Sequence, residues 1–197
     1  MTKVIIAVLL ALGVAWGATA HSPKVSQKAI SERTTFTLEF EDSHCSGTAV
    51  SSNVILSAAH CFPTDEAISF KVDGRDAKVI KIARDGKDHI LVKVNIGLHY
   101  KAKLSKGQLE KGDRVYYFGN PGTPDIFRSG EYSGTHEGAL VFDINSWQGD
   151  SGAAVFNEQG EIVAVVNALM KIDIFKLTIC YPLEFTKDQY ESMGVVL

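Results

Sequence analysis

The chain of 197 residues is long enough for one large β domain or two small ones, and its ordinary globular composition, 45% hydrophobic and 22% charged, excludes disorder, collagen and a coiled coil. The formal net charge of −3 argues against nucleic-acid binding, which needs a concentrated basic face. The feature most like such a face is a cluster of four lysines, which acidic residues soon interrupt, so we expect it to be a solvated loop. The four are Lys101, Lys103, Lys106 and Lys111.

The first twenty residues are typical of a secretory signal peptide. Lys3 provides a short basic start, residues 4–16 are apolar, and Ala18 and Ala20 form a small-x-small cleavage site. The alternative is a membrane anchor, but the apolar run is shorter than the roughly 20 residues that span a bilayer. We therefore expect cleavage after Ala20, loss of the Lys3 charge to leave a mature chain 21–197 of net charge −4, no membrane attachment, and a secreted or periplasmic location.

Export makes the three cysteines informative, because disulfides persist outside the cytosol. Cys45 and Cys61 are near enough in sequence to close a loop of about 17 residues, which is worth roughly 3 kcal/mol on the loop-entropy model. Cys180 is then unpaired, and it ends the apolar run 172–179, so we expect a buried and unreactive thiol.

Most of the mature chain consists of short apolar segments separated by turn residues. Residues 35–40 alternate with period two, and Gly, Asp, Asn and Pro stand between the segments. No segment is followed by a long amphipathic helix, so the pattern favours barrels or a sandwich over a βαβ fold. The other expected strands lie within 68–72, 77–82, 90–96, 114–118, 126–132, 139–144, 152–156 and 162–166.

A histidine beside a cysteine ends a hairpin-like segment. The segment reads CSGTAV from Cys45 and then VILSAAHC, in which Cys61 directly follows His60. This motif resembles the trypsin-like serine peptidases, and the resemblance implies that His60 is a general base and that Cys45 pairs with Cys61. We expect surface or loop positions for the histidines that lack this context: His21, His44, His89, His99 and His136.

Asp88 stands just before the apolar run 90–92. In the trypsin-like family an aspartate in this position accepts the second imidazole N–H and stabilises the imidazolium, so the resemblance assigns that role to Asp88. Asp85 and Asp76 are rivals, but neither stands immediately before such a run. The 28-residue interval from His60 to Asp88 is similar to that of compact bacterial and viral members.

The segment QGDSG contains the candidate nucleophile. A serine hydroxyl needs a base to take its proton and backbone N–H donors for the oxyanion. The glycines flanking Ser151 permit the sharp turn that presents both, although the motif alone also occurs in ordinary turns. The resemblance, which covers residues 36–166, implies an acyl-enzyme on Ser151 and an oxyanion hole formed by the N–H groups of Gly149 and Ser151.

The resemblance also implies the architecture: an all-β fold of two six-stranded antiparallel barrels, roughly 35–110 and 111–183, with the active site between them. A short C-terminal helix follows, because residues 186–189 fit a capping box and Gly194 can end the segment. The expected partner is a polypeptide substrate, and a protein inhibitor is a second possible partner. No metal or organic cofactor is expected, since no His/Cys/Asp cluster has ligand spacing.

Two departures from the family pattern stand out. Ala153 replaces a usual glycine, a small change that should be tolerated. The expected mature start has no Ile-Val-Gly-Gly type sequence, so Asp150 lacks the amino-terminal partner of the animal enzymes. Either another donor holds Asp150, or the site needs an activation step.

Substrate selectivity follows from the same alignment. Asn145, six residues before Ser151, should form the floor of the side-chain pocket, and Asn167, Ala168 and Leu169 should lie along the bound peptide. Leu169 should narrow the pocket, so we expect a preference for small or medium uncharged residues. The rival is Asp143, whose carboxylate on the floor would select Lys or Arg instead.

Two other classes of function fit the sequence less well than a peptidase does. A catalytically silent binding protein on the same scaffold normally lacks a member of the triad, and all three residues stand here. A serine hydrolase of the α/β type would carry its serine in Gly-x-Ser-x-Gly with the histidine last in the chain, which is the reverse of this order.

Overall fold

The computed structural model describes residues 26–62, 64, 69–119, 126–172 and 175–197. The expected signal peptide and His21 lie outside the described residues. Among the residues that are described, no helix is both long and apolar enough to cross a membrane.

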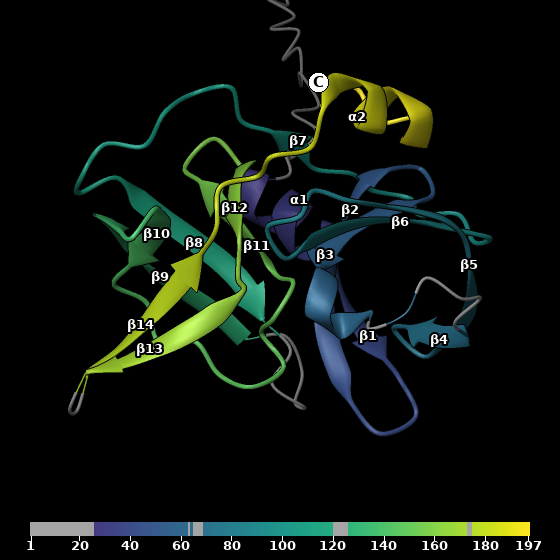
Figure 1. Ribbon diagram of the computed structural model, residues 1–197, viewed down its shortest axis with the longest axis horizontal. Helices are drawn as coiled ribbons and strands as arrows, with labels where there is room; N and C mark the ends of the chain where they lie inside the picture. The colour runs from purple at the N-terminus through teal and green to yellow at the C-terminus, as the bar shows by residue number, and fades with distance from the viewer. Residues whose placement is uncertain (1–25, 63, 65–68, 120–125, 173–174) are drawn as a thin grey trace, which may run out of the picture.

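The first half of the chain forms a closed six-stranded barrel in the order β1-β2-β3-β6-β5-β4, with every pair antiparallel (Figure 1). Strand β3 is buried along its whole length because both of its faces pack against apolar side chains. Ile55 points into the barrel core, whereas Val54 and Leu56 join a core shared with the second half. The strands are β1 (Thr35–Glu39), β2 (His44–Ser51), β3 (Val54–Ala58), β4 (Ser69–Val72), β5 (Arg75–Arg84) and β6 (His89–Val94).

The second half forms one eight-stranded sheet in the order β13-β14-β10-β9-β8-β11-β12-β7, where six strands were expected. The short β7 adds one strand by pairing in parallel with β12, and β13 and β14 extend the other side as a hairpin. The strands are β7 (Lys103–Leu104), β8 (Arg114–Gly119), β9 (Ile126–His136), β10 (Ala139–Phe142), β11 (Ala154–Asn157), β12 (Glu161–Val165), β13 (Ala168–Ile172) and β14 (Phe175–Cys180).

Two α-helices complete the described fold. The predicted C-terminal helix is confirmed as α2 (Lys187–Met193), with a capping box at Thr186 and a left-handed Gly194 at its end. Helix α1 (Gln27–Thr34) was not predicted, because its sequence is polar and its buried residues are Ser31 and Thr34 rather than an apolar stripe. It contacts β1, β2 and β8, and so lies between the two halves (Figure 1).

Candidate active site

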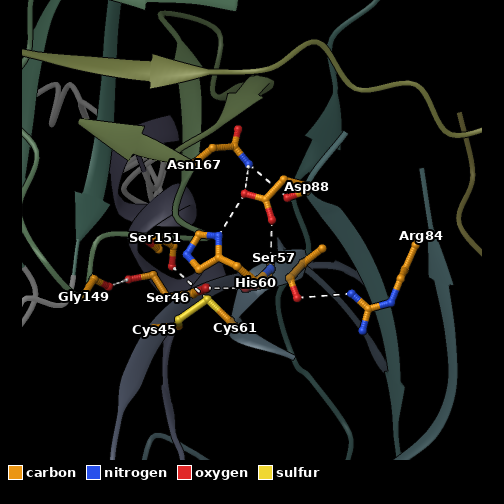
Figure 2. The surroundings of a disulfide bond; sticks show 11 residues. Cys45, Ser46, Ser57, His60, Cys61, Arg84, Asp88, Gly149, Ser151 and Asn167 are labelled. Carbon is orange, nitrogen blue, oxygen red and sulfur yellow. Dashed lines mark hydrogen bonds and ion pairs between the residues drawn. A yellow bond between two sulfur atoms is a disulfide. The ribbon is translucent and has the colours of Figure 1, made fainter. Parts of the chain in front are cut away.

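His60 and Asp88 meet at the edge of the barrel. His60 lies in a single 3-10 turn, η1 (Ala59–Cys61), directly after β3, and Asp88 lies in the turn between β5 and β6. The Nδ1 atom of His60 is 2.8 Å from Oδ2 of Asp88, and the backbone N–H of His60 donates to Oδ1 at 2.8 Å. Both oxygens of the carboxylate are therefore engaged by one residue (Figure 2).

These contacts shift the pKa values of both groups. The hydrogen bond to Asp88 raises the pKa of His60 above 6.5, although burial opposes the shift. Burial alone would raise the pKa of Asp88, but hydrogen bonds from the ring and backbone of His60 and from Asn167 together hold that pKa below its ordinary value. Asp88 is therefore a carboxylate at neutral pH, and its charge favours a proton on His60.

The segment around His60 is fixed from two sides. The guanidinium of Arg84 donates to the carbonyls of Ala59, at 3.1 Å, and of Phe62. The predicted disulfide is confirmed, since Cys45 and Cys61 are bonded and so join η1 to β2. The sequence reasoning did not find Arg84, because nothing local to it indicates that its side chain reaches the carbonyls around His60.

The sulfur atoms near His60 offer no thiolate to a metal ion. Within the described residues, Cys45, His60 and Cys61 are the one group of potential ligand atoms that lie within 4.8 Å of one another. Both cysteines belong to the disulfide. Cys180 is free and fully buried as predicted, and burial raises the pKa of its thiol, which makes it unreactive.

Ser151 reaches this site from the second half, in the loop between β10 and β11. The backbone N–H of Ser46 donates to the carbonyl of Ser151 at 2.8 Å, and the Ser46 hydroxyl donates to the carbonyl of Gly149 at 2.9 Å. The Ser151 carbonyl lies 3.9 Å from Sγ of Cys61, so these contacts hold Ser151 beside the disulfide that anchors η1, the turn that carries His60 (Figure 2). In the described part of the chain, the N–H groups of Gly149 and Ser151 have no hydrogen-bond partner.

Gly152 is required where the two halves touch. Its φ of +88° is left-handed, and a Cβ added there would lie 2.1 Å from the Ser46 carbonyl oxygen and 2.2 Å from Oγ of Ser57. No side chain fits that space, so the residue after Ser151 must be glycine.

Asp150 has a partner from within the chain. Its carboxylate is fully buried, and its Oδ2 atom accepts from the Tyr117 hydroxyl at 3.0 Å and from the Trp147 N–H at 2.8 Å. The Nε atom of Arg128, on β9, forms an ion pair with the same oxygen at 3.2 Å. Burial raises the pKa of Asp150, and these three neighbours oppose the rise. Sequence reasoning missed Arg128, because its strand gives no sign of the loop that it contacts.

The expected substrate-binding residues lie in two different environments. Ala168 and Leu169 are exposed on β13, which is an edge strand of the sheet. Asn145 is also exposed, and its carbonyl accepts from the Tyr117 hydroxyl at 3.1 Å, while the rival Asp143 is exposed as well. Asn167 differs from these residues, because it is only 5% exposed and its side chain faces Asp88.

One expectation about the histidines was wrong. His89 is fully buried at the start of the barrel strand β6, because Asn167 and Phe185 of the second half lie against its ring. Its ring meets Asp85, so this rival of Asp88 is engaged elsewhere, and the other rival, Asp76, is exposed on β5. His99 and His136 are exposed as predicted.

Comparisons with known proteins give one family match and several similar folds. The family model described as "Trypsin-like peptidase domain" matches residues 45–165. Among solved structures, the active form of the Rv3671c protease from M. tuberculosis has a TM-score of 0.71 at 14% identity, covering 87% of this chain and 85% of that one. The serine endoprotease from Yersinia pestis has a TM-score of 0.69 at 20% identity, covering 87% and 69%. These two likenesses show the fold alone, and no curated protein matches significantly in sequence.

Proposed function

This chain belongs to the trypsin-like peptidase family, and we propose that it cleaves peptide bonds with Ser151 as nucleophile, His60 as general base and Asp88 as the partner of His60. Family membership makes it a serine-type endopeptidase whose substrates are polypeptides. The bond of 2.8 Å between Nδ1 of His60 and Oδ2 of Asp88 carries the residue assignment, because a histidine base of this kind needs a carboxylate on that nitrogen.

In the proposed reaction, Nε2 of His60 takes the proton of the Ser151 hydroxyl as Oγ attacks the peptide carbonyl. Asp88 holds the opposite ring nitrogen and stabilises the imidazolium. The N–H groups of Gly149 and Ser151 bind the oxyanion, a role that their lack of partners in the described chain supports. His60 then gives the proton to the leaving amine, and water attacks the acyl-enzyme with His60 again as base.

We also propose that residues 1–20 direct export and are removed after Ala20. The basic start, apolar run and small-residue cleavage site support this proposal, and the Cys45–Cys61 disulfide fits an extracytoplasmic peptidase. A mature amino terminus at His21 is the measurable sign of this step.

A fluorophosphonate probe, which labels an activated serine covalently, tests the assignment directly. We expect labelling of the wild type and of the control Ser133→Ala, whose serine is an exposed residue of β9, and none of Ser151→Ala. Ser151→Ala and His60→Ala should each lower kcat by about 10⁴- to 10⁶-fold, and combining them should add little, because the triad acts as a unit.

Either of two results would overturn the assignment. Labelling that persists in Ser151→Ala would show that another serine is the nucleophile. An unlabelled and inactive wild type would favour the alternative function, a binding protein on a peptidase scaffold that has lost its chemistry.

A further inference from the structure

A second histidine–aspartate pair, which the proposed reaction does not use, lies beside Asp88. Nδ1 of His89 is 2.5 Å from Oδ2 of Asp85, and both side chains are 0% exposed. Burying two ionisable groups costs more than filling the same space with apolar side chains. The pair therefore calls for an explanation beyond packing.

Asp85 is bonded at both oxygens. Its Oδ1 accepts from the N–H groups of Lys87, at 2.8 Å, and of His89, at 3.1 Å, and its Oδ2 also accepts from the Glu184 N–H at 3.1 Å. Burial raises the pKa of Asp85, but these bonds together hold it below its ordinary value. Asp85 is thus an ionised acceptor, and the nitrogen of His89 that faces it is the donor.

Asn167 lies between the two pairs in one orientation. Its Oδ1 accepts from the backbone N–H of Tyr181 at 2.9 Å, and its Nδ2 donates to the carbonyl of Asp88 at 2.9 Å. A backbone N–H only donates and a carbonyl only accepts, so the carboxamide cannot be reversed. Nε2 of His89 lies 3.2 Å from Oδ1, so the His89 ring contacts the oxygen end of the carboxamide.

Asp88 needs such support. Its φ of +73° is left-handed, a conformation that is strained for a residue with a side chain and persists only where neighbours impose it. Nδ2 of Asn167 binds the Asp88 carbonyl and also its Oδ2, at 3.2 Å, which is the oxygen that faces His60 (Figure 2). Asn167 thus holds both the backbone and the carboxylate of Asp88.

We propose that His89 and Asp85 are positioning residues, which hold the Asn167 carboxamide so that it directs the Asp88 carboxylate at His60. The sequence of contacts is Asp85 to His89, His89 to Asn167, and Asn167 to Asp88. Asn167 comes from the second half and the other residues from the barrel, so the contacts also link the two halves at the site. This inference rests on the proposed triad.

A double-mutant cycle with His89→Leu and Asn167→Ala tests it, with kcat and KM measured on a peptide substrate. Each single variant should lower kcat by about 10- to 100-fold, as expected for a displaced catalytic group, with little change in KM. His89→Leu should cost nothing further in the Asn167→Ala background, because it acts only through that residue. An equal loss in both backgrounds, or none in either, would refute the proposal.

Ser31→Ala is the matched control, because the Ser31 hydroxyl forms a buried hydrogen bond with the Tyr116 hydroxyl, and neither residue belongs to the triad or to the contacts described above. It should lower the Tm without changing kcat. If His89→Leu does not fold, Asp85→Asn, which keeps the shape of the side chain, takes its place in the cycle with the same expected pattern.

Proton NMR of the hydrogen bond between His60 and Asp88 gives a readout that does not need activity. The Nδ1 proton of His60, identified by its loss in His60→Ala, should shift in Asn167→Ala and His89→Leu and stay unchanged in Ser31→Ala. An inactive wild type would disprove the proposed function alone, whereas an unshifted proton would disprove the positioning role alone.

Discussion

His60 and Asp88 fix each other through two hydrogen bonds, one from the imidazole ring and one from the backbone of His60. The left-handed backbone of Asp88 is held in turn by the N–H of Ala59, which donates to its carbonyl at 2.9 Å. A short side chain on a constrained backbone has few rotamers, so the carboxylate points in a single direction. In the proposed mechanism, the histidine base therefore depends on one strained aspartate that its neighbours hold in place.

The pH dependence of activity follows from the pKa of His60. The base must be neutral to accept a proton, so kcat/KM should rise with pH, with a midpoint above 6.5 because Asp88 raises that pKa. Asp88→Asn removes the negative partner, so the midpoint should fall, and kcat should drop about 10⁴-fold with the fold intact. Rate profiles of both proteins measure this, and an unchanged midpoint would assign the acid limb to another group.

Each member of the proposed triad lies in a connection next to a strand rather than within a strand. His60 follows β3, Asp88 precedes β6, and Ser151 precedes β11. Strands β3 and β6 are paired, with Ala58 opposite His89, so the register of one ladder brings the ends that carry His60 and Asp88 together. Functional residues on short connections between rigid strands combine precise placement with access to substrate.

Strand β13 should set the side-chain preference. An edge strand can bind an extended peptide as one more strand, and Ala168 and Leu169 are exposed there. A peptide-library profile should show cleavage after small or medium uncharged residues, if uncharged Asn145 forms the pocket floor and Leu169 narrows its entrance as the family alignment implies. Leu169→Gly should admit larger residues. Dominant cleavage after Lys or Arg would instead place Asp143 on the floor.

The two halves form one body because they share side chains. Val54, Leu56 and Leu91 of the barrel pack with Phe156 and Ile162 of the second half in one apolar cluster. The contacts of Ser46 with Gly149 and Ser151 cross the same junction. Correct docking of the halves therefore assembles the site, and the ion pair between Arg128 and Asp150 stabilises the loop that docks.

Activity of the whole molecule should depend on Arg128 and not on a free amino terminus. Arg128→Met leaves Asp150 as a buried carboxylate without its cation, which should disorder the loop that carries Ser151. The loss in kcat should be about 100-fold or more, similar to the loss of an oxyanion donor. Extending the mature amino terminus by a tag should leave kcat unchanged. Full activity in Arg128→Met would show that Tyr117 and the Trp147 N–H suffice.

The sequence predicted those features of the fold that depend on residues close together in the chain. The capping box at Thr186 and the glycine at position 194 predicted α2, because both signals act within one or two helical turns. Alternation of apolar residues predicted four of the barrel strands, β1, β4, β5 and β6, since it decides which face of a strand is buried. The cysteines around His60 predicted the disulfide, and the roles of His60, Asp88 and Ser151 stay predictions until they are tested.

Only the tertiary structure decided which partner each polar group meets. Helix α1 has no apolar stripe, and its Ser31 is buried by Tyr116, 85 residues further along the chain. His89 was expected in a surface or loop position, but it is buried, and Asn167 of the second half contacts its ring. Arg128 of β9 forms an ion pair with Asp150 in the loop between β10 and β11. The Asn167 side chain is held by the Asp88 carbonyl and the Tyr181 N–H, which are far apart in the chain. Local patterns do not encode such contacts, because the free energy that decides them exists only when distant segments are packed together.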